Sequence, residues 1–255
     1  DLQRQEFSEG NIYLTQSEMD QGNVIVETIQ NIISKSESDS IGLCFPGIKN
    51  DRGVVIMANG PRIPDLLERI QGIGSIPHDS DCCVLGEWKS TIGKLQNCDN
   101  AVYIGGGTGI ADGIILKGKM IDFNARDDVK RSWELKIPSG ETIESCLSPK
   151  WMIHQWNISQ REKVETLDQL SQNQNANTIF EKATEALSFL IQNRTQFFKA
   201  NHAKIEKIVI GQRLGIFMAN SKLISLLESN TDIPLDYSTD RRTAALGAAW
   251  KRICS

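Results

Sequence analysis

The stretch AVYIGGGTGIADGIILKGKMI, residues 101–121, places four glycines in five positions between two apolar runs. The apolar residues 101–104 predict a strand, and residues 113–121 predict a hairpin around Lys117-Gly118. Successive glycines let the backbone approach an anion closely, and their N–H groups then form an anion-binding hollow. The stretch therefore predicts a phosphate-binding turn, with a glycine-rich hairpin that binds no ligand as the alternative.

Two common kinds of phosphate loop do not fit this stretch. The chain contains no G-x-x-x-x-G-K-[ST] string, so a P-loop is excluded. A G-x-G-x-x-G fingerprint fails because its sixth position is Ile110 or Asp112, and the chain continues into a hairpin rather than a helix. The remaining kind is the strand–turn–strand element of the actin, hexokinase and Hsp70 superfamily, in which Thr108 would add a hydroxyl donor.

Composition limits the classes of function. The chain has 255 residues, 40% hydrophobic content and a formal net charge of −4, with charges of both signs mixed along it. Nothing indicates a nucleic-acid surface, and no apolar run approaches the ~20 residues that a membrane span needs. The polar start resembles neither a signal nor a transit peptide. Six cysteines without a C-x-x-C pair predict reduced thiols in a cytoplasmic protein and no zinc site.

Strand-like and helix-like segments alternate along the chain, which predicts a layered α/β architecture. Residues 123–150 are polar and are expected to be irregular, and a Gln/Asn-rich linker is expected near residues 170–176. Near the end, the small residues around Gly247 would allow a helix to pack closely against a neighbour. The expected strands are 41–45, 53–57, 101–104 and 208–210, and the expected helices are 24–34, 65–70, 79–90, 180–191, 216–229 and 241–253.

Five motifs occur in an order and spacing that resemble the ROK family of sugar kinases and related repressors. They are GLCFPG at 42–47, HDSDCCVLGE at 78–87, GTGIADG at 107–113, IVIGQ at 208–212 and AALGAA at 244–249. The resemblance covers about residues 20–253. It implies a ribonuclease H-like actin/hexokinase ATPase fold, with two α/β domains around a cleft. Residues 1–98, joined by part of the 240–255 helix, would form an incomplete N-terminal domain, and residues 99–255 the C-terminal one.

The resemblance assigns the catalytic base to Asp79. In the family, the aspartate eight residues before the Glu of the second motif acts on the sugar hydroxyl that attacks the γ-phosphate. A carboxylate within hydrogen-bond reach of that hydroxyl orients it and accepts its proton. A helix N-cap is the alternative role of Asp79, and the two roles are compatible. The family's Asn before this aspartate, which holds the sugar, is replaced here by His78.

Three more residues would hold the sugar on the same resemblance. Glu134, in SWELKI, matches the Glu of the family's A-G-E-x-G-H motif, although Ile137 takes the place of the His. Glu144, in GETIESCLS, matches the Glu of G-C-L-E. Asn59 resembles an Asn that faces the sugar. Exposed carboxylates and a turn Asn before Gly are the alternatives.

On the nucleotide side, Gly107, Thr108, Gly109 and Gly211 would face ATP, with Mg²⁺ as its companion ion and no residue assigned as a metal ligand. The family has a second glycine at the position of Gln212, where a side chain would crowd the base. The family's first motif, D-x-G-G-T, is absent from residues 1–50. Either the recorded chain lacks native residues at its start, which we favour, or the protein is a degenerate kinase.

The resemblance thus implies ATP-dependent phosphorylation of a hexose or N-acetylhexosamine by a glucokinase-like ROK sugar kinase. The alternative is a non-catalytic sugar-binding pseudokinase or sensor, which the residues at 78, 137 and 212 favour. No helix-turn-helix precedes the domain, so a DNA-binding repressor is not expected. Homodimers are common in the family, so the expected partners are sugar, nucleotide and a second copy of the chain, without nucleic acid or membrane.

Overall fold

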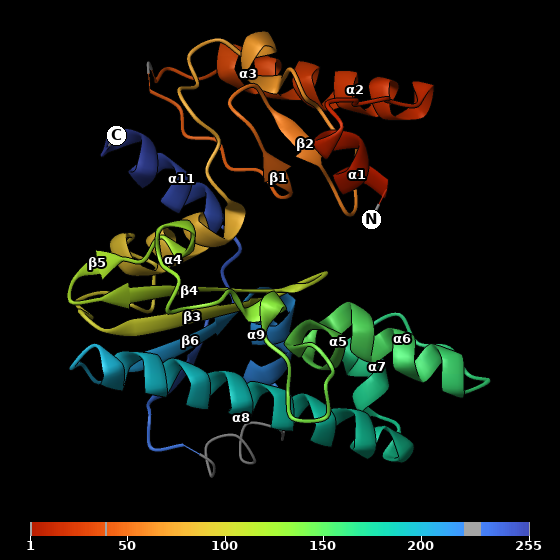
Figure 1. Cartoon of the computed structure of the whole chain (residues 1–255), viewed down its shortest axis with the longest axis vertical. Coiled ribbons are helices and arrows are strands. Elements are labelled where there is room, and N and C mark those ends of the chain that lie inside the picture. Colours follow the sequence, from red (N-terminus) through yellow and green to blue (C-terminus); the bar gives the residue numbers. More distant parts are fainter. Residues whose placement is uncertain (1, 39, 222–230, 255) are drawn as a thin grey trace. The chain divides into compact units, whose positions relative to one another are not determined.

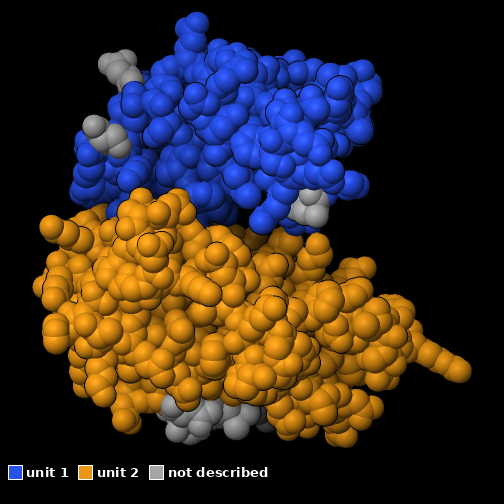
Figure 2. All heavy atoms as spheres, in the orientation of Figure 1, with its two compact units in different colours: residues 1–86, 244–255 blue, residues 87–243 orange. Residues whose placement is uncertain are grey.

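The computed structural model describes residues 2–38, 40–221 and 231–254. The chain divides into two compact units, which Figure 2 colours separately. Unit 1 comprises Asp1–Gly86 with Ala244–Ser255, and unit 2 comprises Glu87–Thr243. The sequence placed the division near residue 98, whereas the contacts divide the chain inside helix α4 (Asp79–Lys89).

Unit 2 is built on a five-stranded mixed sheet with the order β5-β4-β3-β6-β7 (Figure 1). Strand β3 pairs antiparallel with β4 and parallel with β6, which in turn pairs parallel with β7. The predicted hairpin after the glycines is confirmed, since Lys117 and Gly118 both have positive φ, at 52° and 69°, between β4 and β5. The strands are β3 (Ala101–Gly106), β4 (Ile110–Leu116), β5 (Lys119–Met120), β6 (Lys207–Gly211) and β7 (Leu235–Tyr237).

Helices of unit 2 form its core with alternate residues of the central strands. Val102 and Ile104 of β3 share a cluster with Ile208 and Ile210 of β6, as the two-residue period of a strand requires. The long helix α8 adds its apolar stripe to this cluster and runs along the sheet in Figure 1. Besides the end of α4, the helices that the structure describes in this unit are α5 (Ile143–Leu147), α6 (Pro149–Ser159), α7 (Leu167–Ser171), α8 (Asn177–Ala200) and α9 (Gln212–Ala219).

The polar region 123–150 is more ordered than the sequence suggested. It contains two 3₁₀ turns, Phe123–Ala125 and Ser132–Glu134, as well as α5 and the start of α6. Local caps explain these short helices: the side chain of Thr142 accepts the N–H of Ser145, and Ser148 caps α6 before Pro149. Part of the helix expected at 216–229 is the end of α9, and residues 222–229 lie outside the described residues.

A buried ion pair crosses the core of unit 2. Asp112 of β4 and Arg194 of α8 are both inaccessible to solvent, and Arg194 Nη2 lies 2.7 Å from Asp112 Oδ2. Arg194 also donates to the carbonyl of Lys130, while Asp112 Oδ1 accepts the N–H of Ser132 at 2.8 Å. The pair therefore joins strand, helix and the 3₁₀ turn Ser132–Glu134, although the two residues are 82 positions apart.

Unit 1 has a smaller core under its longest helix. Val26 of α2 packs with Val54, Ile63 and Leu66, among others. The two strands form only a short antiparallel sheet. The elements are α1 (Leu2–Ser8), α2 (Gln16–Ser34), β1 (Ile48–Lys49), β2 (Val54–Ile56), α3 (Leu66–Arg69), the first part of α4, and α11 (Thr243–Ile253).

The prediction of a strand at 41–45 is wrong, because this segment does not join a sheet of the described residues. Only Phe45 forms a bridge, with His78, and its N–H donates to the carbonyl of Pro77 at 3.4 Å. The backbone of the segment instead packs closely on α11. The contact at Gly42 is so close that a Cβ there would overlap the backbone of Ala248. An apolar run becomes a strand only where another strand pairs with it, and the described residues supply no such partner here.

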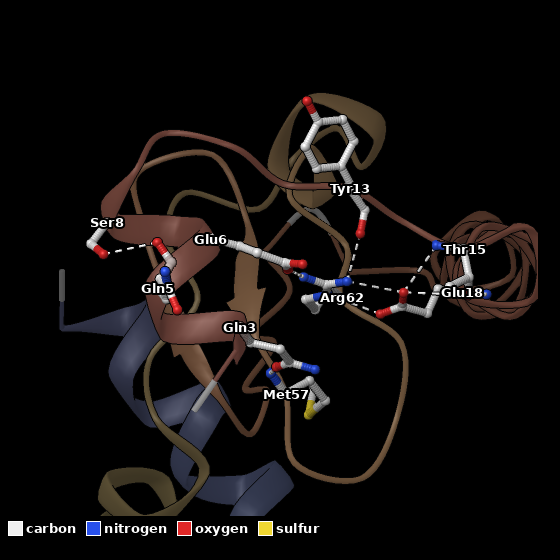
Figure 3. Close-up of polar contacts among 9 residues, drawn as sticks. All are labelled: Gln3, Gln5, Glu6, Ser8, Tyr13, Thr15, Glu18, Met57 and Arg62. Atoms are coloured by element: carbon white, nitrogen blue, oxygen red, sulfur yellow. Dashed lines mark hydrogen bonds and ion pairs between the residues drawn. The ribbon is translucent and has the colours of Figure 1, made fainter.

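Arg62 organises the polar side of unit 1 (Figure 3). This nearly buried side chain donates from Nη1 to Glu6 at 2.8 Å and from Nε to Glu18 at 2.9 Å, and also donates to the carbonyl of Tyr13. The hydrogen bond from Arg62 is the largest cause that lowers the pKa of Glu18 to about 2. Glu18 also completes a capping box with Thr15 at the start of α2.

The close packing predicted around Gly247 is confirmed within unit 1. A Cβ on Gly247 would overlap the carbonyl oxygen of Cys82 in α4 and lie 2.8 Å from the nitrogen of Gly86. All six cysteines are free thiols. None of the described helices is long and apolar enough to span a membrane.

Candidate functional site

The glycine turn, Gly106–Gly109, connects β3 to β4, with Gly106 buried and the next three residues partly or fully exposed. The N–H of Gly107 donates to the carbonyl of Gly109 at 3.0 Å, and Thr108 at the tip is exposed. Inside the sheet, Gly106 needs to be glycine because a Cβ there would lie 2.5 Å from the Cβ of Leu214. At Gly107 and Gly109, by contrast, an added Cβ would meet only the ends of two side chains, those of Gln212 and Glu144.

Gln212 lies across this turn. It has a positive φ of 61° at the start of α9, an uncommon conformation for a residue with a side chain. Its Oε1 is 2.7 Å from a Cβ built on Gly107, and its Nε2 is 3.4 Å from one built on Gly105. The expected crowding by Gln212 therefore falls on the glycine turn itself.

Gly211, expected to face the nucleotide, has a local reason to be glycine. It is buried opposite Gly105 in the parallel ladder, and a Cβ there would lie 2.5 Å from the hydroxyl of Tyr103. Tyr103 is itself almost fully buried in β3. Packing accounts for this glycine, and a role at the nucleotide remains a proposal.

Glu144 reaches the glycine turn from α5. Its Oε2 accepts the N–H of Ile110 at 3.3 Å, and a Cβ on Gly109 would overlap the same oxygen. Glu134 is exposed at the end of the neighbouring 3₁₀ turn, where its Oε2 accepts the N–H of Arg131 at 2.9 Å. Ser132 of that turn donates to the carbonyl of Ile110. Unit 2 thus gathers Glu144 at the glycine turn, with Glu134 on an adjoining element.

His78 and Asp79 lie at the start of α4 in unit 1. The helix begins at Asp79, so Asp79 stands in the first turn and the residue before the helix is His78. The carbonyl of His78 accepts the N–H of Cys82 at 3.1 Å. Both side chains are half-buried, whereas Asn59 is exposed in the turn after β2.

Glu87, the last residue of the same motif, is buried in unit 2. Its Oε2 accepts the N–H of Lys94 at 2.9 Å. Burial raises the pKa of the Glu87 carboxyl, opposed first by a hydrogen bond from Ser238. Glu87 therefore supports the chain after α4 and does not reach the solvent.

Lys49 is a polar neighbour of His78 that the sequence analysis missed. Its Nζ donates to the carbonyls of Phe45 at 2.7 Å and Gly47 at 2.8 Å, and lies 3.3 Å from His78 Nδ1. Burial lowers the pKa of Lys49 to about 8, although Asp79 and Asp81 oppose this shift. A single lysine after the Pro46-Gly47 turn gave no pattern that could have identified it.

The described residues of the two units contain no metal cluster, and the apolar void of unit 2 is small. No group of three or more His, Cys, Asp or Glu side chains is arranged to bind a metal among residues 2–38, 40–221 and 231–254. Unit 2 has an apolar void of about 20 Å³ between α8 and α9, lined by residues such as Phe180 and Phe217. Such a void has room for about one water molecule, not a sugar or nucleotide.

Neither a protein-family model nor a curated protein sequence matches the chain. Solved structures do. A ROK hexokinase from Thermus thermophilus superposes with a TM-score of 0.69 at 18% identity, over 91% of this chain and 86% of that one. A ROK family glucokinase from Streptomyces griseus, in complex with glucose and AMPPNP, gives 0.65 at 13% identity, over 91% and 88%.

A ROK family transcriptional regulator, a homolog of the E. coli MLC protein, superposes with a TM-score of 0.63 at 16% identity, over 93% of this chain and 68% of that one. Kinases and a regulator thus share this architecture, and the identities are low. The strand order of unit 2 and these superpositions together identify the fold predicted from the five motifs. The chain has the actin/hexokinase-type fold of the ROK-family sugar kinases.

Proposed function

We propose that the protein is a sugar kinase that transfers the γ-phosphoryl group of ATP to a hydroxyl of a hexose or N-acetylhexosamine. The single observation that carries the proposal is the glycine turn with Thr108 exposed at its tip, in a fold shared with a glucokinase in complex with glucose and AMPPNP. Backbone N–H groups of such a turn suit phosphate oxygens.

In the proposed reaction, Asp79 orients the sugar hydroxyl and accepts its proton. The hydroxyl oxygen forms the new P–O bond while the bond to the departing ADP breaks. His78, Glu134, Glu144 and Asn59 are the proposed sugar ligands, since carboxylates, amides and imidazole all hydrogen-bond to hydroxyl groups.

The nucleotide would contact Gly107, Thr108, Gly109 and Gly211. Its fit to the glycine turn depends on side chains that can move, because only the ends of Gln212 and Glu144 lie over Gly107 and Gly109. Mg²⁺ would be held by the phosphates and water with at most one or two carboxylates, a pattern that needs no preformed cluster. Bound Mg·ATP supplies the electrophilic phosphorus.

A second function, a non-catalytic sugar sensor, is supported by Gln212. Its side chain lies across the glycine turn where the family has glycine, and the fold is also that of a ROK regulator. In this case sugar binding remains and phosphoryl transfer is lost.

One experiment separates the two functions. The purified protein is incubated with Mg·ATP and a panel of hexoses and N-acetylhexosamines in an assay that couples ADP release to NADH oxidation. A kinase releases ADP with at least one sugar, and release stops when that sugar is omitted. A sensor gives no sugar-dependent ADP but shows a raised thermal midpoint with sugar alone. Neither signal with any sugar would contradict both functions.

A further inference from the structure

The ammonium group of Lys49 has three hydrogens and faces three acceptors. Two are the carbonyl oxygens of Phe45 and Gly47, at 2.7 and 2.8 Å. The third is His78 Nδ1, at 3.3 Å. A carbonyl oxygen only accepts hydrogen bonds, so the two carbonyls take two of the three N–H groups. The third N–H is left for the histidine ring.

This arrangement constrains the protons of His78. A ring nitrogen that accepts a hydrogen bond carries no proton, so a neutral His78 must carry its proton on Nε2. The β-bridge between Phe45 and His78 holds their backbones side by side, so that the ammonium group of Lys49 stays beside the His78 ring. Lys49 itself lies in β1, on a different element from His78.

We propose that Lys49 is a positioning residue that holds His78 as the Nε2–H tautomer, so that His78 donates a hydrogen bond to an oxygen of the sugar. The role in sugar binding rests on the proposed function, whereas the tautomer does not. The family's Asn supplies both a donor and an acceptor at this position. His78 held in this way supplies a donor only, which favours a sugar oxygen that accepts.

The charge of Lys49 makes this arrangement sensitive to pH. Burial lowers the pKa of Lys49 to about 8, and the acidic neighbours act in the opposite direction. Above that pH the neutral amine keeps two hydrogens and gains a lone pair. The two carbonyls retain the hydrogens, and His78 then donates from Nδ1 to the lone pair, which removes its Nε2 proton. The titratable groups that face Lys49 are Cys44, His78, Asp79, Asp81 and Cys82.

The tautomer is measured directly by long-range ¹H–¹⁵N correlation spectra of the protein labelled at histidine. The chain has only three histidines, so His154→Gln and His202→Gln identify the His78 signals. We expect His78 to be protonated on Nε2 at pH 7, and to move to Nδ1 with a midpoint near pH 8. Protonation on Nδ1 or on both nitrogens at pH 7, or no change up to pH 9.5, overturns the proposal.

Variants sharpen the same measurement. Lys49→Met should increase the Nδ1–H population at pH 7 several-fold, and Lys35→Met, at an exposed lysine of the same unit, should leave it unchanged. If Lys49→Met does not fold, the pH titration of the unaltered protein still decides the question. Identical spectra in the folded Lys49→Met variant and the unaltered protein contradict the proposal.

Kinetics then test the role in sugar binding. Loss of the donor should raise the KM for sugar about tenfold in Lys49→Met, with a smaller effect on kcat. In the unaltered protein the KM for sugar should rise between pH 7 and 9, and Lys49→Met should flatten this profile. Lys49→Met should add no further loss in a His78→Asn background. An equal loss in both backgrounds shows that Lys49 acts by another route.

The two proposals fail in different ways. If no sugar is bound or phosphorylated, the proposed function has failed, and the spectra still decide whether Lys49 sets the tautomer. If sugar is phosphorylated but His78 is protonated on Nδ1 at pH 7, the kinase proposal stands and the role of Lys49 is withdrawn.

Discussion

The two units are stabilised in different ways. Unit 2 has a five-stranded sheet, a large apolar cluster and one ion pair removed from water. Unit 1 has a two-stranded sheet and a smaller core. The nearly buried Arg62 joins its helices α1 and α2 by binding one partly exposed carboxylate on each of them. The stability of unit 1 should therefore depend more on pH and on close helix packing, and that of unit 2 on its interior.

The largest expected effect is in unit 2. Asp112→Ala leaves the guanidinium of Arg194 buried without its carboxylate, and breaking such a pair costs about 3–5 kcal/mol. Hydrogen–deuterium exchange should show lost protection in β3, β4 and α8. An exposed control, Asp128→Ala, should have little effect because its partner Arg126 remains in contact with water. Unchanged protection in Asp112→Ala would mean that the buried pair does not stabilise unit 2.

The next effect concerns helix packing in unit 1. Gly247→Ala places a Cβ against the backbone of α4, which has no flexible side chain to move aside, so we expect destabilisation by about 3 kcal/mol. Gly22→Ala in α2 is the matched control. There the nearest atom, Ile63 Cγ1, is at 3.4 Å, and the helix should gain about 0.5–1 kcal/mol. Equal thermal midpoints for the two variants would show that α11 does not pack on α4 as closely as described.

A smaller effect is expected from the Arg62 network. Arg62→Met should destabilise unit 1 by about 2 kcal/mol through lost charge-assisted hydrogen bonds. Because the folded pKa of Glu18 is lowered to about 2, its stabilising contribution is complete above pH 4.5 and is lost as the pH falls through about 2.

The measurement for this network is exchange protection of α2 between pH 7 and pH 3, in the unaltered protein and in Glu18→Gln. The Glu18→Gln variant should be less stable than the unaltered protein at pH 7, and its exchange protection should decline less as the pH falls. A Glu18→Gln variant with the same acid decline as the unaltered protein would assign that decline to other carboxylates.

Features that depend on residues close together in the chain were easier to predict from the sequence than features that depend on distant partners. The strand at 101–104, the chain reversal at the glycines and the Lys117-Gly118 hairpin depend on neighbours in the chain and were predicted correctly, whereas phosphate binding at the glycine turn stays a prediction. The strand at 41–45 was wrong because pairing depends on a partner strand, which an apolar pattern does not reveal. The short helices within 123–150 were missed because their caps, Thr142 and Ser148, occur in a polar segment without apolar periodicity.

The residues of the candidate site also fall into those that the sequence could indicate and those that only the fold brings together. The resemblance assigned Asp79, whereas the glycine pattern itself indicated a phosphate-binding turn, and both roles remain predictions. The positions of Glu144 and Gln212 at the turn follow from folding. Glu144 is 34 positions from its partner Ile110, and Gln212 is 106 positions from its bridge partner Gly106. Lys49 could not be predicted from the sequence, because only the folded bridge between Phe45 and His78 places it beside the ring.

The most direct test of the account is the rate of phosphoryl transfer by Asp79→Asn in the coupled assay, with the best sugar found for the unaltered protein. A base that orients and deprotonates the hydroxyl contributes roughly 10²–10⁴-fold, so kcat should fall by that factor while the thermal midpoint shift with sugar is retained. Turnover equal to that of the unaltered protein would contradict the assignment of Asp79 as the base.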